Sequence, residues 1–224
     1  MPLRFSRLLI PILLLLCLVN DAFSATYISL PHPKLSGGIS LEEALLKRRS
    51  VRSYIDKALS LEELSQLLWA ANGITDTRRG FRTAPSAGAL YPIDIYVVIN
   101  RVTGVDKGVY RYLPKEHKLE LLKLEDVSLK LYEAALWQGP VKEASVVFIL
   151  ASFHERITWK YGQRGIRYAY IECGHICQNI LLQATSLKLG AVPIGAFIDD
   201  KVSAILNLPS NAEPVYIVPV GKLQ

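Results

Sequence analysis

The sequence predicts a single α+β domain that follows a short N-terminal targeting segment. The chain has 224 residues, enough for one domain with a sizeable core or for two small domains. Half of the residues are hydrophobic and 21% are charged, a balance typical of ordered globular proteins and not of disordered chains. Helical and strand-like patterns mix in irregular order after residue 40, and no linker divides them. We therefore expect one mixed domain over residues 40–224.

Residues 1–24 predict a secretory signal peptide. Arg4 and Arg7 precede an apolar run over 8–19, and its 12 residues are about half of what a membrane-spanning helix needs. Ala22-Phe23-Ser24 then supplies the small residues of a cleavage site. An uncleaved membrane anchor is the main alternative, whereas a lipoprotein is disfavoured because Cys17 follows a leucine instead of a small residue. We expect export, periplasmic or secreted, with membrane contact only through this segment.

The charge balance argues against a nucleic-acid partner. Removing the signal peptide would remove two Arg and one Asp, which lowers the formal net charge from +6 to +5. This mild excess is not clustered into the basic stripe that nucleic-acid binding requires. An acidic small ligand is the simpler partner.

Cys173, His175 and Cys177 form a metal-like cluster that helical geometry separates. On a helix, Cys173 and Cys177 share one face, while His175 points about 200° away from Cys173. Side chains four residues apart lie about 5–6 Å apart at Cβ, too far for an unstrained disulfide. We interpret the two cysteines as buried thiols and expect no metal site.

Two serine-led capping boxes predict two helices near the start of the domain. Ser40–Glu43 opens a short helix that ends in the basic residues 47–49, and Ser60–Glu63 opens a second one. Asn72-Gly73 ends this second helix. The preceding residues 25–39 contain two prolines and a Gly-Gly pair, so we expect an extended lead-in with turns.

The remaining elements follow from hydrophobic periodicity. We expect strands over 94–99, 145–151, 192–198 and 215–220, a hairpin with arms at 109–112 and 119–122, and helices over 126–137 and 165–187.

The predicted helix over 165–187 carries an unusual polar stripe. Tyr168, Glu172, His175 and Asn179 share one face, opposite an apolar face. An ordinary solvated face would carry Lys and Glu, so this composition indicates a polar lining or a subunit interface. An ordinary exposed surface is the alternative.

Three short motifs carry candidate chemistry. Arg48-Arg49-Ser50-Val51-Arg52 places three guanidinium groups and a hydroxyl within five residues, a set that suits a phosphate. The alternative is that these cations only stabilise the end of a helix. The segments 84–92 and 192–197 are rich in small residues that let a backbone approach a flat ligand.

Together these motifs resemble the FMN-dependent nitroreductase superfamily. The resemblance rests on Arg-Arg-Ser-x-Arg at 48–52, Pro-Ser-Ala-Gly-Ala-Leu-Tyr-Pro at 85–92 and Pro-x-Gly-Ala-Phe at 193–197. Residues 64–71, 164–168 and Glu172-x-Gly-His-x-x-Gln-Asn resemble more closely the SagB/ThcOx-type dehydrogenase branch. The match runs from about residue 40 to residue 222. It implies a nitroreductase-like fold, in which helices flank a central, mostly antiparallel sheet, with FMN at a homodimer interface.

The resemblance also implies the residues that contact FMN. One chain would contact the ribityl phosphate, the pyrimidine edge and the N5 edge. Its residues are Arg48, Arg49 (partly through its backbone), Ser50, Arg52, Gln138, Gly195, Ala196 and Lys222. Those from the partner subunit are Ser86, Ala87 and Ala89. Many relatives have Asn where Ala89 stands, so a side-chain contact to FMN is lost here. Many also have Glu-Gly where Gly195-Ala196 stands, and without this Glu the resemblance does not imply a particular nitro substrate.

Lys160-Tyr161 resembles the pair that takes a ring proton in the SagB/ThcOx-type branch. A Lys beside a phenol in a pocket is a sensible general-base pair, and a surface Lys beside a packing Tyr is the alternative. The implied reaction is two-electron hydride transfer at flavin N5 with ping-pong kinetics, and NAD(P)H is a candidate electron donor. The substrate, a small molecule or a peptide, is not identified. A flavin-binding electron-transfer module and a non-catalytic family member are the alternative functions.

Overall fold

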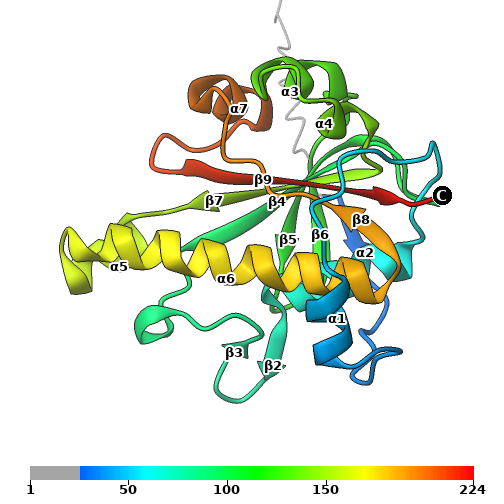
Figure 1. The fold of residues 1–224 in the computed structure, drawn as a ribbon. Coiled ribbons are helices and arrows are strands. Elements are labelled where there is room, and N and C mark those ends of the chain that lie inside the picture. Colours follow the sequence, from blue (N-terminus) through cyan, green and yellow to red (C-terminus); the bar gives the residue numbers. More distant parts are fainter. Residues whose placement is uncertain (1–25) are drawn as a thin grey trace, which may run out of the picture.

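In the computed structural model, which describes residues 26–224, seven strands of the described part form one antiparallel sheet. Their order across the sheet is β1-β6-β5-β4-β7-β9-β8 (Figure 1). The strands are β1 (Tyr27–Ser29), β4 (Ile93–Ile99), β5 (Gly108–Leu113), β6 (Lys118–Lys123), β7 (Val146–Ser152), β8 (Leu189–Ala191) and β9 (Glu213–Lys222), while β2 (Ile74–Asp76) and β3 (Phe81–Arg82) pair separately. The predicted α+β class is therefore confirmed. The predicted signal peptide lies outside the described residues.

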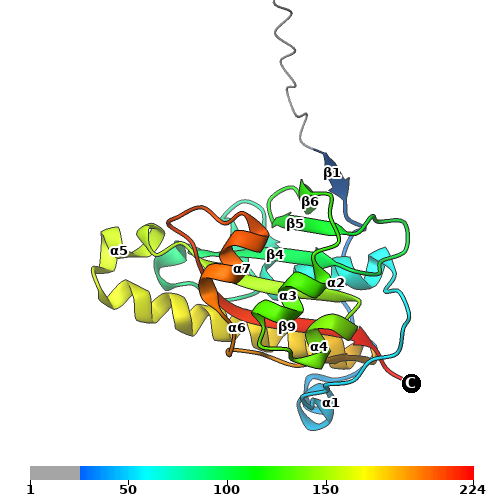
Figure 2. The ribbon, with the colours of Figure 1, turned by 90° about the horizontal axis from the view of Figure 1, so that it is seen from above.

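Helices cover both faces of this sheet, as Figures 1 and 2 show. They are α1 (Leu41–Lys47), α2 (Leu61–Asn72), α3 (Ser128–Ala134), α4 (Gly139–Glu143), α5 (Glu155–Tyr161), α6 (Arg164–Ser186) and α7 (Asp199–Leu206). Helices α2 and α6 pack on one face, whereas α3, α4 and α7 pack on the other. Every residue of β7 is buried because both of its faces are covered, which explains its continuous apolar sequence. None of the helices described is long and apolar enough to span a bilayer.

The predicted start and end signals of α2 are confirmed. Ser60 and Glu63 form both hydrogen bonds of the capping box, and Gly73 is the C-terminal cap. Gly73 adopts an extended conformation instead of the left-handed one, with φ −72° and ψ 161°. Glycine is required because a Cβ there would lie 2.4 Å from the Trp69 ring. In α1 the box is only half formed, since Glu43 pairs with Lys47.

The longest helix, α6, confirms the prediction for 165–187 and orients the candidate site. Its apolar face packs on the sheet, and Cys173 and Cys177 are buried there as free thiols. Burial raises the pKa of the Cys177 thiol to about 12 and also raises that of Cys173, so both are poor nucleophiles. His175 is exposed on another side of the helix.

Two sequence-based element predictions were wrong in detail, and a third segment, the predicted extended lead-in, also joins the sheet. The segment 192–198 is not a strand, because beyond β8 it only makes an isolated bridge between Ile194 and Ile217. Pro193 has no N–H to donate, which is consistent with this break in the ladder. The helix expected over 126–137 ends at Ala134, and the backbone then turns through two left-handed residues. The lead-in 25–39 contributes β1, which pairs with β6.

Candidate functional site

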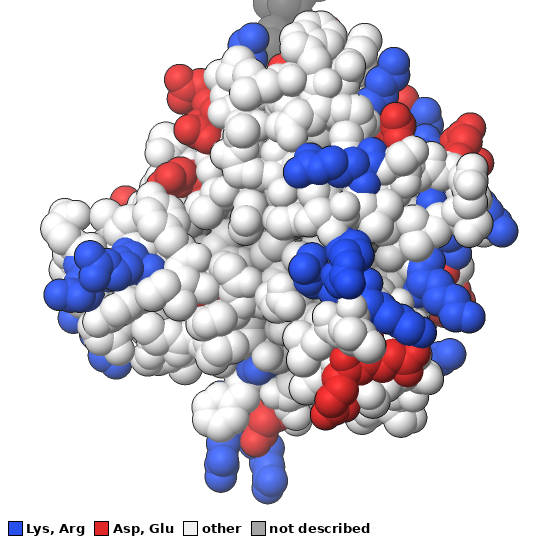
Figure 3. Space-filling view, viewed as in Figure 1, with Lys and Arg blue, Asp and Glu red and all other residues white. Residues whose placement is uncertain are grey.

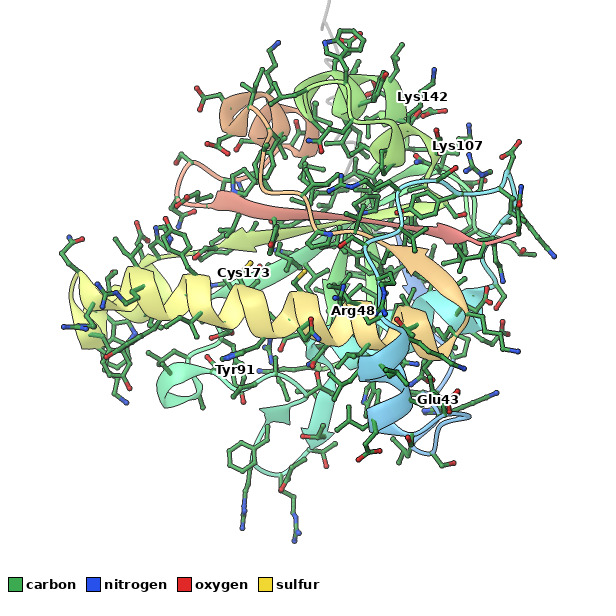
Figure 4. All side chains as sticks on the ribbon, in the orientation of Figure 1. Glu43, Arg48, Tyr91, Lys107, Lys142 and Cys173 are labelled. Carbon is green, nitrogen blue, oxygen red and sulfur yellow. The ribbon has the colours of Figure 1, made fainter. Side chains whose placement is uncertain are left out.

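The arginine motif lies in an extended segment fixed to the edge of the sheet. The Val51 N–H donates to the Ala191 carbonyl at 3.0 Å, and the Ile55 N–H donates to the Lys222 carbonyl at 3.0 Å. These two bonds hold residues 48–55 against β8 and β9. Figure 4 shows Arg48 beside the C-terminal part of α6.

The three arginines of this motif have different surroundings. The Arg49 guanidinium turns back to donate to the carbonyls of Leu46 (2.9 Å) and Arg48 (2.7 Å). Its side chain therefore caps the end of α1, as in the alternative interpretation. Within residues 26–224, neither Arg48 nor Arg52 forms an ion pair. Figure 3 shows a group of Lys and Arg side chains on this part of the surface.

Lys222 is already paired in the structure. Its ammonium group lies 2.5 Å from Glu63, whose other oxygen accepts the Ser60 N–H at 2.8 Å. Both side chains of the pair are about one fifth exposed. A phosphate contact by Lys222, as the resemblance implies, requires that this pair open or be shared. The sequence did not indicate Glu63 as its partner.

Gln138 and the Gly195-Ala196 segment are brought together. The Gln138 side-chain amide donates to the Ala196 carbonyl at 2.8 Å and to the Ala135 carbonyl at 3.0 Å. Gly195 and Ala196 are exposed, and a Cβ added to Gly195 would lie 3.8 Å from the Tyr216 ring. Tyr216, which the motifs did not indicate, therefore lies beneath this segment. We call the residues Arg48, Ser50, Arg52, Gln138, Gly195 and Ala196 the arginine cluster, because the resemblance assigns them to one ligand.

The loop over 85–92 has a tightly constrained backbone. The Tyr91 N–H donates to the Ser86 hydroxyl oxygen at 2.8 Å. Gly88, Ala89 and Tyr91 have φ values of 63°, 53° and 48°, in the left-handed region that non-glycine residues rarely adopt. Such a conformation persists where the surrounding structure enforces it. Here the enforcing neighbours include the end of α5.

Lys160 and Tyr161 lie directly against this loop. A Cβ added to Gly88 would lie 2.7 Å from the Tyr161 hydroxyl and 3.0 Å from the Lys160 ammonium. The Tyr161 ring also meets the Tyr168 ring edge to face, with centroids 5.2 Å apart. The structure thus brings the Lys-Tyr pair and the small-residue loop into one place. We call Ser86, Ala87, Ala89, Lys160 and Tyr161 the loop cluster.

A pocket of about 280 Å³ opens beside the loop cluster. It is lined by Pro85, Ser86, Ala87, Tyr168, Ile171, Glu172 and His175. Three of the four polar residues predicted to share one face of the helix therefore line a single pocket, whereas Asn179 lines a different groove.

Glu172 is the most perturbed group in this pocket, with only 2% of its surface exposed. Burial raises the pKa of its carboxyl group to about 7, opposed by the Ser86 hydroxyl and the Arg82 guanidinium. Arg82, which the motifs did not indicate, is itself partly buried over the Tyr91 ring.

The pocket and the arginine segment 48–52 lie at different places along α6. The pocket is lined by residues up to 175, whereas the arginine segment packs near Leu181 and Thr185. At 1.5 Å per residue, the 13 residues from Glu172 to Thr185 span about 20 Å.

Residues 45–222 match the Nitroreductase family. The chain is 48% identical over 184 residues to a protein of Methanocaldococcus jannaschii named as a nitroreductase, covering 82% of this chain and 91% of that protein. It is 29% identical over 175 residues to the microcin B17-processing protein McbC of Escherichia coli, covering 74% of this chain but only 63% of McbC. A crystal structure of a nitroreductase of Ralstonia eutropha superposes with a TM-score of 0.77 at 28% identity, covering 88% and 90% of the two chains.

Proposed function

Because the chain belongs to the nitroreductase family, an oxidoreductase family, we propose that it is an FMN-dependent oxidoreductase of the SagB/ThcOx-type dehydrogenase branch. The observation that supports the branch is the position of Lys160 and Tyr161. A Cβ added to Gly88 would lie 2.7 Å from the Tyr161 hydroxyl and 3.0 Å from the Lys160 ammonium. Lys160 is exposed and Tyr161 packs partly on the core, so the support for a general-base pair comes from their contact with the small-residue loop alone. Tyr161 contacts Tyr168, which lines the pocket beside the loop, so a proton acceptor here would lie close to that pocket.

The donor groups of the arginine cluster fit FMN. Arg48 and Arg52 offer guanidinium groups without an ion pair in the described chain, and Ser50 adds a hydroxyl within the same segment. Planar guanidinium forks bind phosphate oxygens in pairs, so these residues would hold the ribityl phosphate. The exposed Gly195-Ala196 backbone leaves room for a flat ring beside it. When bound, FMN would supply two-electron chemistry, for which NAD(P)H is the candidate donor.

We propose that a second copy of the chain completes the site. The middle of α6 presents Ile171, which is 50% exposed, and Gly174, where an added Cβ would meet no atom within 4 Å. The surface over this part of α6 is largely uncharged in Figure 3, unlike its two ends. A bare, uncharged helix face lets a second helix approach closely.

An antiparallel pair of α6 helices crossing near Gly174 would join the two clusters. Residue 175 is midway between the bounds of α6, Arg164 and Ser186, so residues near 185 of one copy would lie beside residues near 165 of the other. The arginine cluster of one copy would then lie beside Lys160-Tyr161 of its partner. This arrangement would close the separation of about 20 Å that a single chain leaves.

In this site the chain's own residues would position a substrate and take its proton. Lys160 and Tyr161 would accept the proton from a substrate carbon as the electron pair leaves with a second hydrogen. McbC is named for processing microcin B17, so a peptide heterocycle is one substrate class and a small molecule is the other. We also propose export through residues 1–24. A fusion reporter that is active only in the cytoplasm would contradict export.

An absorption spectrum of the purified protein after FMN addition tests the proposal. We expect a bound flavin spectrum that bleaches when NADH or NADPH is added without oxygen. A bound flavin that stays oxidised would point to another reductant or an electron-transfer role. Protein that retains no FMN would contradict the proposed function.

A further inference from the structure

A buried carboxyl group lies behind the catalytic pair without a partner. Glu172 is 2% exposed, and neither of its carboxyl oxygens has a hydrogen-bond partner of good geometry in the described chain. The Arg82 guanidinium is near enough to act on its charge, but the two form no salt bridge, and Arg82 Nε also lacks a partner. A purely structural carboxylate would normally be paired, because an unpaired buried charge is costly.

Glu172 lies in a row with Tyr168 and His175 along the pocket, and the Tyr168 ring contacts the Lys-Tyr pair. The Tyr161 ring contacts the Tyr168 ring, and Tyr168, Glu172 and His175 follow one another along the pocket wall. His175 is exposed and so ends the row at the solvent. A pocket of about 280 Å³ has room for several waters, each of which takes about 30 Å³.

The groups that act on Glu172 come from three parts of the chain. Arg82 of β3 and the Ser86 hydroxyl favour its charged form, while burial opposes it. On α6 itself, Tyr168 and His175 line the same pocket, and the buried Cys173 thiol is influenced by the Glu172 charge. This setting lets both protonation states of Glu172 exist without a permanent partner.

We propose that the pocket beside Glu172 is the proton path of the active site and that Glu172 is the group that passes protons along it. The inference rests on the proposed function. In each dehydrogenation a substrate carbon would give one proton to Lys160-Tyr161, and FMN, when bound, would supply the acceptor for the hydride that the substrate also loses. The pair must lose that proton before the next turnover. It passes to Glu172 through Tyr168, Ser86 or pocket water, and from there to His175 and solvent, with no change in electron count.

Proton exchange by Glu172 can be measured without any turnover. Infrared difference spectra between about pH 6 and about pH 8 should show a protonated carboxyl band that disappears as the pH rises. The band should be absent in Glu172→Gln and kept in Glu133→Gln, which makes the same change at an exposed position of α3. A difference spectrum that is the same in the wild type and in Glu172→Gln would overturn the proposal.

A two-step reaction then tests whether the exchanged proton is used. With NADH and p-benzoquinone as probes, the net reaction is NADH + quinone + H⁺ → NAD⁺ + hydroquinone. NADH gives up hydride without a proton, whereas the quinone needs hydride and a proton to become hydroquinone, so we assign the proton uptake to the quinone step. We expect Glu172→Gln to slow the quinone step about 10-fold or more while the NADH step keeps its rate. Added imidazole should restore the lost rate, because a small buffer can replace a proton carrier but not a structural side chain.

The outcomes separate this inference from the proposed function. Equal slowing of both steps, or no rescue by imidazole, would overturn the proton path while leaving the FMN-dependent reaction intact. A wild-type protein that neither binds FMN nor oxidises NADH would overturn both. Unchanged kinetics in Glu172→Gln would overturn the path even if the infrared band titrates.

Discussion

Replacing Glu172 with glutamine should remove the contribution of this carboxyl group to the pH dependence of stability between about pH 4.5 and about pH 7. The folded protein raises the pKa of this carboxyl group from 4.5 to about 7, mainly because the group is buried. Between these values the unfolded chain releases the proton while the folded chain keeps it. Unfolding is therefore favoured progressively as the pH rises through this window, and the loss of stability is complete above about pH 7.

The size of the effect follows from the shift. Each unit of pKa difference corresponds to about 1.4 kcal/mol, so the wild-type protein should lose about 3 kcal/mol of unfolding free energy from Glu172 across the window. Below about pH 4.5 the carboxyl is protonated in both states, and the group contributes no pH dependence. Glutamine cannot ionise, so the variant should lack this slope. Any cost of burying its amide would be a constant offset.

Urea unfolding of the protein without added FMN, repeated across this pH range, measures the slope directly. The difference in unfolding free energy between Glu172→Gln and the wild type should change by about 3 kcal/mol in favour of the variant as the pH rises. Glu133→Gln, an exposed substitution on α3, should run parallel to the wild type. Parallel curves for Glu172→Gln and the wild type would refute the reasoning that Glu172 is neutral in the folded state at mildly acidic pH.

Four further substitutions, one of them a matched control, test the rest of the candidate site. Arg48→Ala should weaken FMN retention by about 1–3 kcal/mol, the scale of charged hydrogen bonds. Arg49→Ala should weaken it less, because the Arg49 guanidinium already caps α1. An FMN titration followed by fluorescence measures both affinities, and equal effects would reject the assignment of Arg48. Gly88→Ala should destabilise the fold by about 1–2 kcal/mol, since φ is 63° and the new Cβ would meet the Tyr161 hydroxyl, and unchanged urea unfolding would contradict this packing. Glu63→Gln should free the Lys222 ammonium and so tighten FMN binding. The weaker capping of α2 should lower the free energy of unfolding by about 1 kcal/mol or less. Unchanged FMN affinity would show that Lys222 does not reach the phosphate.

Local patterns predicted much of the architecture. The capping box at Ser60, the hairpin arms around residue 115 and the apolar run of β7 all depend on neighbours a few residues apart. Such signals are written in the sequence itself, because hydrogen-bonding side chains and hydrophobic periodicity act over one or two turns. The segment 192–198 misled the same reasoning. This stretch continues from β8 along β9, but its regular pairing ends at Ala191 and only Ile194 still forms a bridge, to Ile217.

The sequence by itself determined the α+β class, the family motifs and the polar face of α6, since each is carried by residues close together in the chain. The tertiary structure alone decided which of these residues meet. Lys222 pairs with Glu63, 159 residues away, and the Lys160-Tyr161 pair packs on Gly88. It also decided that Glu172 is buried without a partner while His175, three residues on, is exposed. Burial and long-range pairing are set by how distant segments pack, and this packing is what changes the charge state of a carboxyl group.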